Sequence, residues 1–215
     1  KKVQGGSVVV TKATENQYNV RVFTDTGYRL DSVKYATSSN SETKDITITN
    51  GQGTIQIDVT TPIIITPTFS KVDYEIRNDA RDKLTYTING ADNSSGLCNY
   101  DDLIAINIIE GKSVTKVFYY YEKDGNTIKV EVPLKNGTRT FRMPAYNVTI
   151  KAEYAITNEA SNILTYSVDG QINSETCYSD GTVTINIIEG QSVEKVFYSY
   201  KVEGKITKVE ISLTD

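Results

Sequence analysis

The hexapeptide INIIEG occupies residues 106–111 and returns at residues 185–190. The similarity extends on both sides, because residues 104–134 align with residues 183–213 at one constant offset and both blocks contain the tetrapeptide KVFY. Self-similarity at a fixed period is the sequence signature of repeated structural units. The two blocks therefore predict two copies of one fold within the chain.

The first third of the chain contains a more divergent copy. Three tandem domains are thus predicted, namely repeat 1 (residues 1–70), repeat 2 (71–155) and repeat 3 (156–215). Repeat 3 has no counterpart of the hairpin that closes repeat 2, so we expect it to be either truncated or capped in a different way. Several positions of repeat 1 align with positions of repeat 2. Val20 and Val22 align with Ile104 and Ile106, and Gly27, Leu30, Val33 and Tyr35 align with Gly111, Val114, Val117 and Tyr119.

Residue usage and patterning favour strands. Thr, Ile, Val and Tyr are abundant, and such residues are enriched in β-sheets. Apolar and polar residues alternate at Ile104, Ile106 and Ile108, which is the period of a strand with one buried face. We predict an all-β fold of three small antiparallel domains, with an Ig-like sandwich favoured and a β-grasp module as the alternative, because no convincing amphipathic helix is found. Tight turns are predicted at Asn50 and Gly51, Glu110 and Gly111, Asp124 and Gly125, and Asn136 and Gly137.

The chain lacks residue types on which much catalysis depends. It contains no His, which excludes Ser-His-Asp and Cys-His nucleophilic machinery and the usual mixed zinc sites. Asp101 with Asp102, and Glu110 with Glu122, come nearest to paired carboxylates, but we interpret them as solvated surface acids. The net charge of −4 comes with scattered Lys and Arg, and apolar stretches are short. We therefore expect no enzyme, no metal, no cofactor, no nucleic-acid partner and no membrane insertion in this segment.

Two cysteines occupy equivalent positions, Cys98 in repeat 2 and Cys177 in repeat 3. Equivalent points on neighbouring domains of this size should lie roughly 25 Å apart, whereas a disulfide needs Cα atoms within about 7 Å. We predict that both are free thiols. A buried, small apolar role is favoured over an intermolecular bridge or a reactive thiol.

Tyrosines provide the candidate ligand surface. The segments FYYY at residues 118–121 and FYSY at residues 197–200 place alternate rings on opposite faces of a strand. In one interpretation an exposed stripe in each repeat stacks on sugar rings. In the other, which the absence of Trp favours, one set of rings packs inside and the other covers a sheet surface. The candidate ligand residues are Tyr119, Tyr121, Tyr198 and Tyr200.

The segment that closes repeat 2 carries a longer motif. It reads TFRMPAYNVTIKAEY over residues 140–154, with an aromatic residue two positions before Met143 and Pro144. This pattern resembles the divergent internalin-type B repeats, which occur in tandem in large secreted and wall-anchored bacterial proteins. Repeat 1 carries a second part of the pattern, the pair Gly27 and Tyr28. The resemblance implies an extracellular location, and it favours the β-grasp alternative.

Repetition without catalytic groups predicts a stalk or spacer, or an adhesin module that presents several surfaces at once. With the resemblance, it implies a secreted protein or one held on the bacterial cell wall. A host or matrix protein or a glycan is then the candidate partner, and the chain is expected to be monomeric. The competing function is a carbohydrate-binding module of a secreted enzyme that uses the tyrosine stripes. A further hypothesis is a Lys-to-Asn crosslink within a domain, for which no residue pair is nominated.

Overall fold

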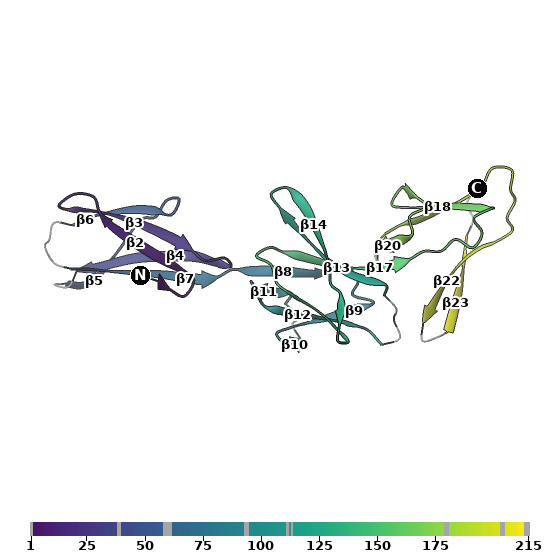
Figure 1. Cartoon of the computed structure of the whole chain (residues 1–215), viewed down its shortest axis with the longest axis horizontal. Helices are drawn as coiled ribbons and strands as arrows, with labels where there is room; N and C mark the ends of the chain where they lie inside the picture. The colour runs from purple at the N-terminus through teal and green to yellow at the C-terminus, as the bar shows by residue number, and fades with distance from the viewer. Residues whose placement is uncertain are drawn as a thin grey trace. The chain divides into compact units, whose positions relative to one another are not determined.

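Strands form the regular structure of the chain, and none of the residues that the structure describes is helical. The all-β prediction is confirmed, and the helix of a β-grasp module is not seen in that part of the chain. The chain divides into two compact units, Lys1–Asp73 and Tyr74–Asp215 (Figure 1). This computed structural model describes residues 2–37, 40–57, 62–92, 95–110, 112, 114–178, 181–202 and 205–212.

The first unit is a sandwich of two antiparallel sheets. One sheet has the order β1-β2-β3-β6, and the other has the order β5-β4-β7. Their inner faces contribute Val8, Val20, Val33 and Ile55 to one buried cluster, as expected when alternate residues of each strand face the opposite sheet. The strands are β1 (Lys2–Val3), β2 (Gly6–Lys12), β3 (Gln17–Thr24), β4 (Tyr28–Thr37), β5 (Asn40–Asp45), β6 (Gln52–Gln56) and β7 (Ile63–Lys71).

Repeat 2 is built on the same plan within the second unit. Its sheets have the orders β10-β9-β12-β16-β15 and β11-β8-β17-β13-β14. Strands β9, β12 and β16 pair as β2, β3 and β6 do, and β14, β13 and β17 pair as β5, β4 and β7 do. The sandwich architecture is the one favoured from the sequence, although the strand order differs from that of immunoglobulin domains. The strands are β8 (Asp73–Asn78), β9 (Leu84–Ile88), β10 (Ala91–Asp92), β11 (Leu97–Asn99), β12 (Leu103–Ile108), β13 (Lys116–Lys123), β14 (Asn126–Glu131), β15 (Leu134–Lys135), β16 (Thr138–Arg142) and β17 (Val148–Ala155).

The core of repeat 2 lies between its two sheets. Leu84 and Ile104 come from one sheet and Val117 and Ile150 from the other, and each of the four is at most 1% exposed. Met143 joins them directly after β16 ends, and its backbone N–H donates to the carbonyl of Asp102 at 2.9 Å. The Met-Pro pair therefore makes a buried corner between β16 and β17, as a proline beyond a strand end allows.

Several tight turns contain residues with positive φ, which asparagine, aspartate and glycine tolerate best. The turns predicted at Asn50, Asp124 and Asn136 are confirmed, since each of these residues and the glycine after it has positive φ. The turn predicted at Glu110 and Gly111 cannot be compared, because Gly111 lies outside the described residues. Two further turns of this kind occupy equivalent places in repeats 2 and 3, at Asn89 with Gly90 and Asp169 with Gly170.

Repeat 3 contains only part of this strand set among its described residues. Strands β18 and β21 pair as β9 and β12 do, and β22 and β23 pair as β13 and β14 do. No described strand of repeat 3 takes the place of β16 or of β17. The strands are β18 (Leu164–Val168), β19 (Gln171–Ile172), β20 (Thr176–Tyr178), β21 (Val183–Ile187), β22 (Val196–Val202) and β23 (Lys205–Ile211).

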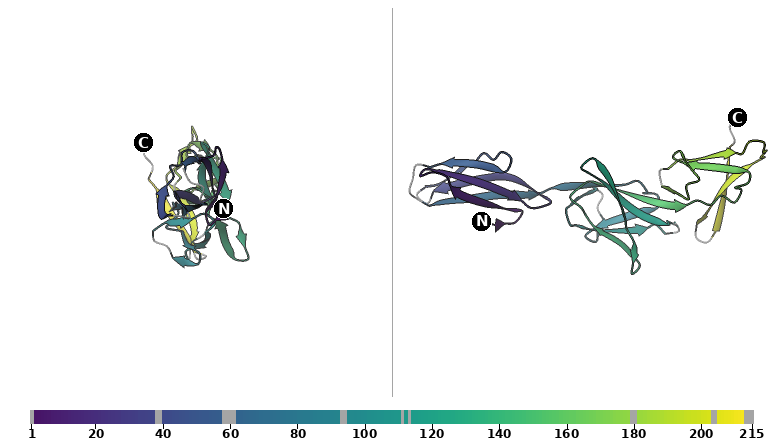
Figure 2. Two further views of the ribbon diagram at one scale, coloured as in Figure 1. Left: turned by 90° about the vertical axis from the view of Figure 1, so that its left-hand side faces the viewer. Right: turned by 45° about the horizontal axis from the view of Figure 1, so that its top comes forward.

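Strand β17 belongs to both repeats of the second unit (Figure 2). Its residues Val148, Thr149 and Ile150 pair in parallel with β8, and its last three residues pair with β20 of repeat 3. Because β8 and β17 run in the same direction, the chain enters repeat 2 at one end and leaves it at the other. The predicted boundary at residue 155 coincides with the end of β17, and the one at residue 70 lies one residue before the end of β7.

Candidate functional site

In repeat 2 the predicted tyrosines belong to a ladder of four rings on the inner side of β13. Tyr119 and Tyr121 lie on the same side of the strand as Val117, which is fully buried. Phe141 stacks on Tyr119 with ring centroids 4.3 Å apart, and Tyr146 stacks on Tyr121 at 5.1 Å. Both tyrosines are half-buried, and burial raises the pKa of Tyr119 above its usual value. These rings close the edge of the core.

In repeat 3 the equivalent tyrosines are exposed. Tyr198 and Tyr200 expose 50% and 47% of their surface. Their rings stack on each other with centroids 6.1 Å apart, the same separation as that of Tyr119 and Tyr121. The structure thus groups the four predicted residues into two matched pairs. A ligand role for either pair stays a prediction.

A groove of about 560 Å³ lies next to the ring ladder of repeat 2. Tyr121 and Tyr146 supply aromatic surface to it, and Glu75, Arg77 and Asn147 supply charged and polar groups. The amide of Asn147 accepts a hydrogen bond from the backbone N–H of Glu75 at 2.9 Å, so it is held in place. Aromatic surface with a few fixed polar groups is the general chemistry of a small-molecule site.

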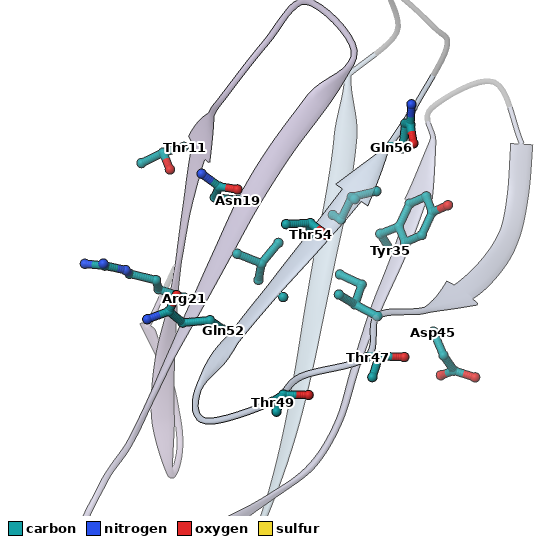
Figure 3. Close-up of a pocket in the computed structure, with 14 residues that line it drawn as sticks. Thr11, Asn19, Arg21, Tyr35, Asp45, Thr47, Thr49, Gln52, Thr54 and Gln56 are labelled. Atoms are coloured by element: carbon teal, nitrogen blue, oxygen red, sulfur yellow. The ribbon is translucent and has the colours of Figure 1, made fainter.

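A second groove, of about 680 Å³, lies within the first unit (Figure 3). Figure 3 shows Arg21 and Gln52 along one side, Tyr35 and Asp45 along the other and Thr54 between them. Most of the side chains that line it are polar. Its single aromatic ring makes it a weaker candidate for a sugar site than the groove of repeat 2.

Repeats 2 and 3 meet in the junction cluster, which we define as Phe118, Tyr120, Lys129, Glu153 and Tyr178. The ammonium of Lys129 donates a hydrogen bond to the Tyr178 hydroxyl at 2.6 Å and lies 3.9 Å above the Phe118 ring centroid. It also lies 3.7 Å from a carboxylate oxygen of Glu153, which is only 7% exposed. The Tyr178 ring meets that of Tyr120 edge to face at 6.0 Å. The contacts of Tyr178 with Lys129 and Tyr120 link the two repeats beyond the shared strand.

Tyr154 and Cys177 lie opposite each other at this joint, whereas Cys98 contacts Tyr74 near the start of β8. Burial, with smaller contributions from Asp82 and Cys177, raises the pKa of Tyr154 to about 12. Its hydroxyl oxygen is buried without a hydrogen-bond partner among the described residues. Cys98 and Cys177 are buried free thiols, which confirms the prediction made for them.

Comparing repeats 2 and 3 residue by residue identifies two members of the junction cluster, one that recurs between the repeats and one that does not. Lys129 recurs as Lys208, and Lys208 lies 3.9 Å above the ring of Phe197 just as Lys129 lies above Phe118. Tyr178, in contrast, takes the position that Asn99 holds in repeat 2. A difference between otherwise similar repeats therefore marks the residue that reaches across the joint.

Among the described residues, no group of three or more acidic, cysteine or histidine side chains is placed to bind a metal ion. No helix in that part of the chain is long and apolar enough to cross a membrane. Comparisons with protein-family models, with curated proteins and with solved structures find no match for this chain. The similarity to internalin-type B repeats therefore stays a resemblance carried by the motif of residues 140–154.

Proposed function

We propose that this chain is a non-catalytic tandem spacer from a secreted or cell-surface protein, in which β-sandwich repeats hold other regions apart. The observation that carries the proposal is the parallel pairing of β8 with β17, the first and last strands of repeat 2. A domain whose ends leave at opposite poles extends a chain, whereas a domain whose ends leave together makes a side branch. The extracellular assignment rests on the resemblance to the bacterial repeats.

The joint between repeats 2 and 3 supports a spacer that resists bending. Strand β17 continues from one repeat into the next without a linker, and its residue Tyr154 lies opposite Cys177 of β20. The junction cluster adds to the same joint the hydrogen bond from Lys129 to Tyr178, the cation–π contact of Lys129 with the Tyr178 ring at 5.0 Å and the edge-to-face contact of Tyr120 with Tyr178.

Small-angle X-ray scattering of the whole chain tests the spacer directly. A compact domain of 215 residues would have a radius of gyration of about 17 Å. We expect a value well above this, because a repeat that the chain enters at one pole and leaves at the other holds its neighbours apart. A radius of gyration at the compact value would contradict the proposal.

Distances between spin labels test the stiffness of the joint. Labels at Lys135→Cys and Ile172→Cys, on exposed sites of repeats 2 and 3, are introduced with Cys98→Ala and Cys177→Ala. We expect a narrow distance distribution that Lys129→Ala and Tyr178→Ala broaden. Lys208→Ala is the matched control, because Lys208 makes the same ring contact outside the joint. A distribution that is equally broad in all variants would refute a stiff joint.

A second candidate function is carbohydrate binding, which the groove beside Tyr121 and Tyr146 favours. Glycan-array binding by the chain should then be lost on Tyr146→Ala, because that ring lines the groove. Tyr198→Ala serves as the control on an exposed tyrosine of repeat 3. Loss of binding on Tyr198→Ala alone would move the site to repeat 3, and no binding to any glycan would remove this candidate.

A further inference from the structure

Repeat 3 presents strand edges that are covered in repeat 2. In repeat 2, β16 pairs with β12 and β17 pairs with β13. In repeat 3 the equivalent strands β21 and β22 have only β18 and β23 as partners among the described strands. Unpaired edges of this kind are templates for the addition of further strands.

The inner face of repeat 3 is apolar and open where the face of repeat 2 is closed. Val183 is 40% exposed, whereas Ile104 at the equivalent position is fully buried. Val196, in contrast, is as buried as its counterpart Val117, so the start of β22 already has its native packing. Phe197 is also more exposed than its counterpart Phe118, at 39% against 6%, so the loss of burial reaches both faces of β22, the strand that lacks a counterpart of β17 beside it among the described strands.

The exposed rings of repeat 3 are already arranged to receive a segment equivalent to β16 and β17. Tyr198 and Tyr200 stack at 6.1 Å with an interplanar angle of 23°, and Tyr119 and Tyr121 stack at 6.1 Å with an angle of 20°. In repeat 2 the segment of β16 and β17 supplies the two outer rings, since Phe141 lies on β16 and Tyr146 lies between the strands. Repeat 3 thus holds the inner half of the same ladder.

A positive charge at the edge of this face would suit a strand that carries an acidic residue, as β17 does in repeat 2. Lys208 is exposed and lies over the Phe197 ring at the distance at which Lys129 lies over Phe118. In repeat 2, Glu153 of β17 pairs with Lys129. An acidic residue at the corresponding place of an added strand would meet Lys208.

We propose that the open face of repeat 3 binds a two-strand segment with the residue pattern of residues 138–155, whose strands, like β16 and β17, join opposite sheets and do not pair with each other. Its first strand pairs with β21 and its second with β22. Its aromatic residues complete the ladder on Tyr198 and Tyr200, and its Val and Ile residues cover Val183. This site is separate from the spacer function, because a chain that fails to extend could still bind the two-strand segment, and an extended chain could fail to bind it.

The test adds a synthetic peptide of residues 134–155 to the whole chain and measures amide hydrogen exchange. We expect the amides of β21 and β22 to slow by about tenfold or more on saturation, since each gains a strand partner, while those of β12 and β13 stay unchanged. A peptide with Phe141→Ala and Val148→Asp should bind more weakly by at least about tenfold, the cost of a lost ring contact and a buried charge.

Variants of the chain locate the binding face. Tyr198→Ser with Tyr200→Ser should weaken binding, whereas Ile172→Ser should not, although Ile172 is 77% exposed in the same repeat. Slowed exchange in repeat 2 instead of repeat 3 would overturn the proposal. So would a concentration-dependent dimer that protects β21 and β22 without peptide, because the face would then be a contact between copies.

A fusion avoids dependence on the solubility of the peptide. Residues 134–155 are joined after Asp215 through a flexible linker, which gives an effective concentration on the order of millimolar. The fused segment should protect β21 and β22, and a fused scrambled sequence should not. If neither the peptide nor the fusion slows exchange in these strands, the proposal is wrong.

Discussion

Ile106 and Ile185 stand at the same position of the same hexapeptide, yet Ile106 is 4% exposed and Ile185 is only partly buried. Tyr119 and Tyr198 differ in the same direction, because Phe141 stacks on Tyr119 at 4.3 Å, whereas the ring that stacks on Tyr198 is that of Tyr200 on the same strand. The strands that carry these residues have similar local sequences. They also have equivalent partners, because β12 and β13 pair with β9 and β14 in repeat 2, and β21 and β22 pair with β18 and β23 in repeat 3. Burial is therefore decided by the strands that pack beside them, here β16 and β17.

The largest expected difference in stability is between alanine substitutions of the two equivalent isoleucines, Ile106 and Ile185. Ile106→Ala should lower the free energy of unfolding of repeat 2 by about 2–5 kcal/mol, because it leaves a cavity in a closed core. Ile185→Ala should lower that of repeat 3 by less than half as much, since its site is already open. Urea unfolding followed by residue-resolved NMR measures both. Equal losses would mean that repeat 3 is as closed as repeat 2.

A smaller effect on stability is expected when the Phe141 ring, which β16 contributes to the core edge, is removed. Phe141→Ala should destabilise repeat 2 by about 2 kcal/mol, because a half-buried ring and its stacking on Tyr119 are lost. The pKa of Tyr119 should fall toward its usual value as water reaches the phenol. Tyrosinate absorbance during an alkaline titration follows this change. Phe23→Ala is the control, since Phe23 is 54% exposed, and it should change stability by less than about 0.5 kcal/mol.

Lys129 and Lys208 occupy equivalent positions, so their substitution compares the joint between repeats 2 and 3 with the exposed surface of repeat 3. Lys129→Gln should cost about 1 kcal/mol, because it removes a partly desolvated cation from the rings of Phe118 and Tyr178. Lys208→Gln should cost less, since its ring contact is exposed to water. Thermal unfolding of the two variants in parallel measures the difference. A larger loss from Lys208→Gln would argue against the junction cluster as a stabilising contact.

The smallest effect is confined to alkaline pH. The pKa of Tyr154 is raised to about 12, so the folded chain keeps this proton at pH values where the unfolded chain has released it. The stabilisation by this group is complete below the usual phenol pKa and is lost as the pH rises toward 12. Tyr154→Phe should flatten the decline of stability over that interval. An unchanged decline would assign it to the other tyrosines.

Much of the fold could be predicted from the sequence because strands leave local signals. Alternation marked β12, the pairs at Asn50, Asp124 and Asn136 marked turns, and the constant offset marked the repetition. The pairing of β8 with β17 could not be read, since it joins segments about 70 residues apart and a parallel pair leaves no turn signal between its strands.

The candidate site was only partly predictable for a related reason. The sequence placed Tyr119 and Tyr198 in equivalent positions, but it could not tell which face of β13 meets the core, because both alternate sets are aromatic. The role of Tyr178 could not be predicted from the sequence, because it depends on a contact with Lys129 from another repeat. Contacts between repeats are set by packing that no single repeat encodes.

Amide hydrogen exchange of the free chain, resolved by residue, tests most directly whether repeat 3 is an open version of repeat 2. Amides of β12 and β13 should exchange only through unfolding of repeat 2, because each strand has partners on both sides. Amides on the free edges of β21 and β22 should exchange at least about a hundredfold faster, through local opening. Equal protection of the two sets of strands would contradict the account.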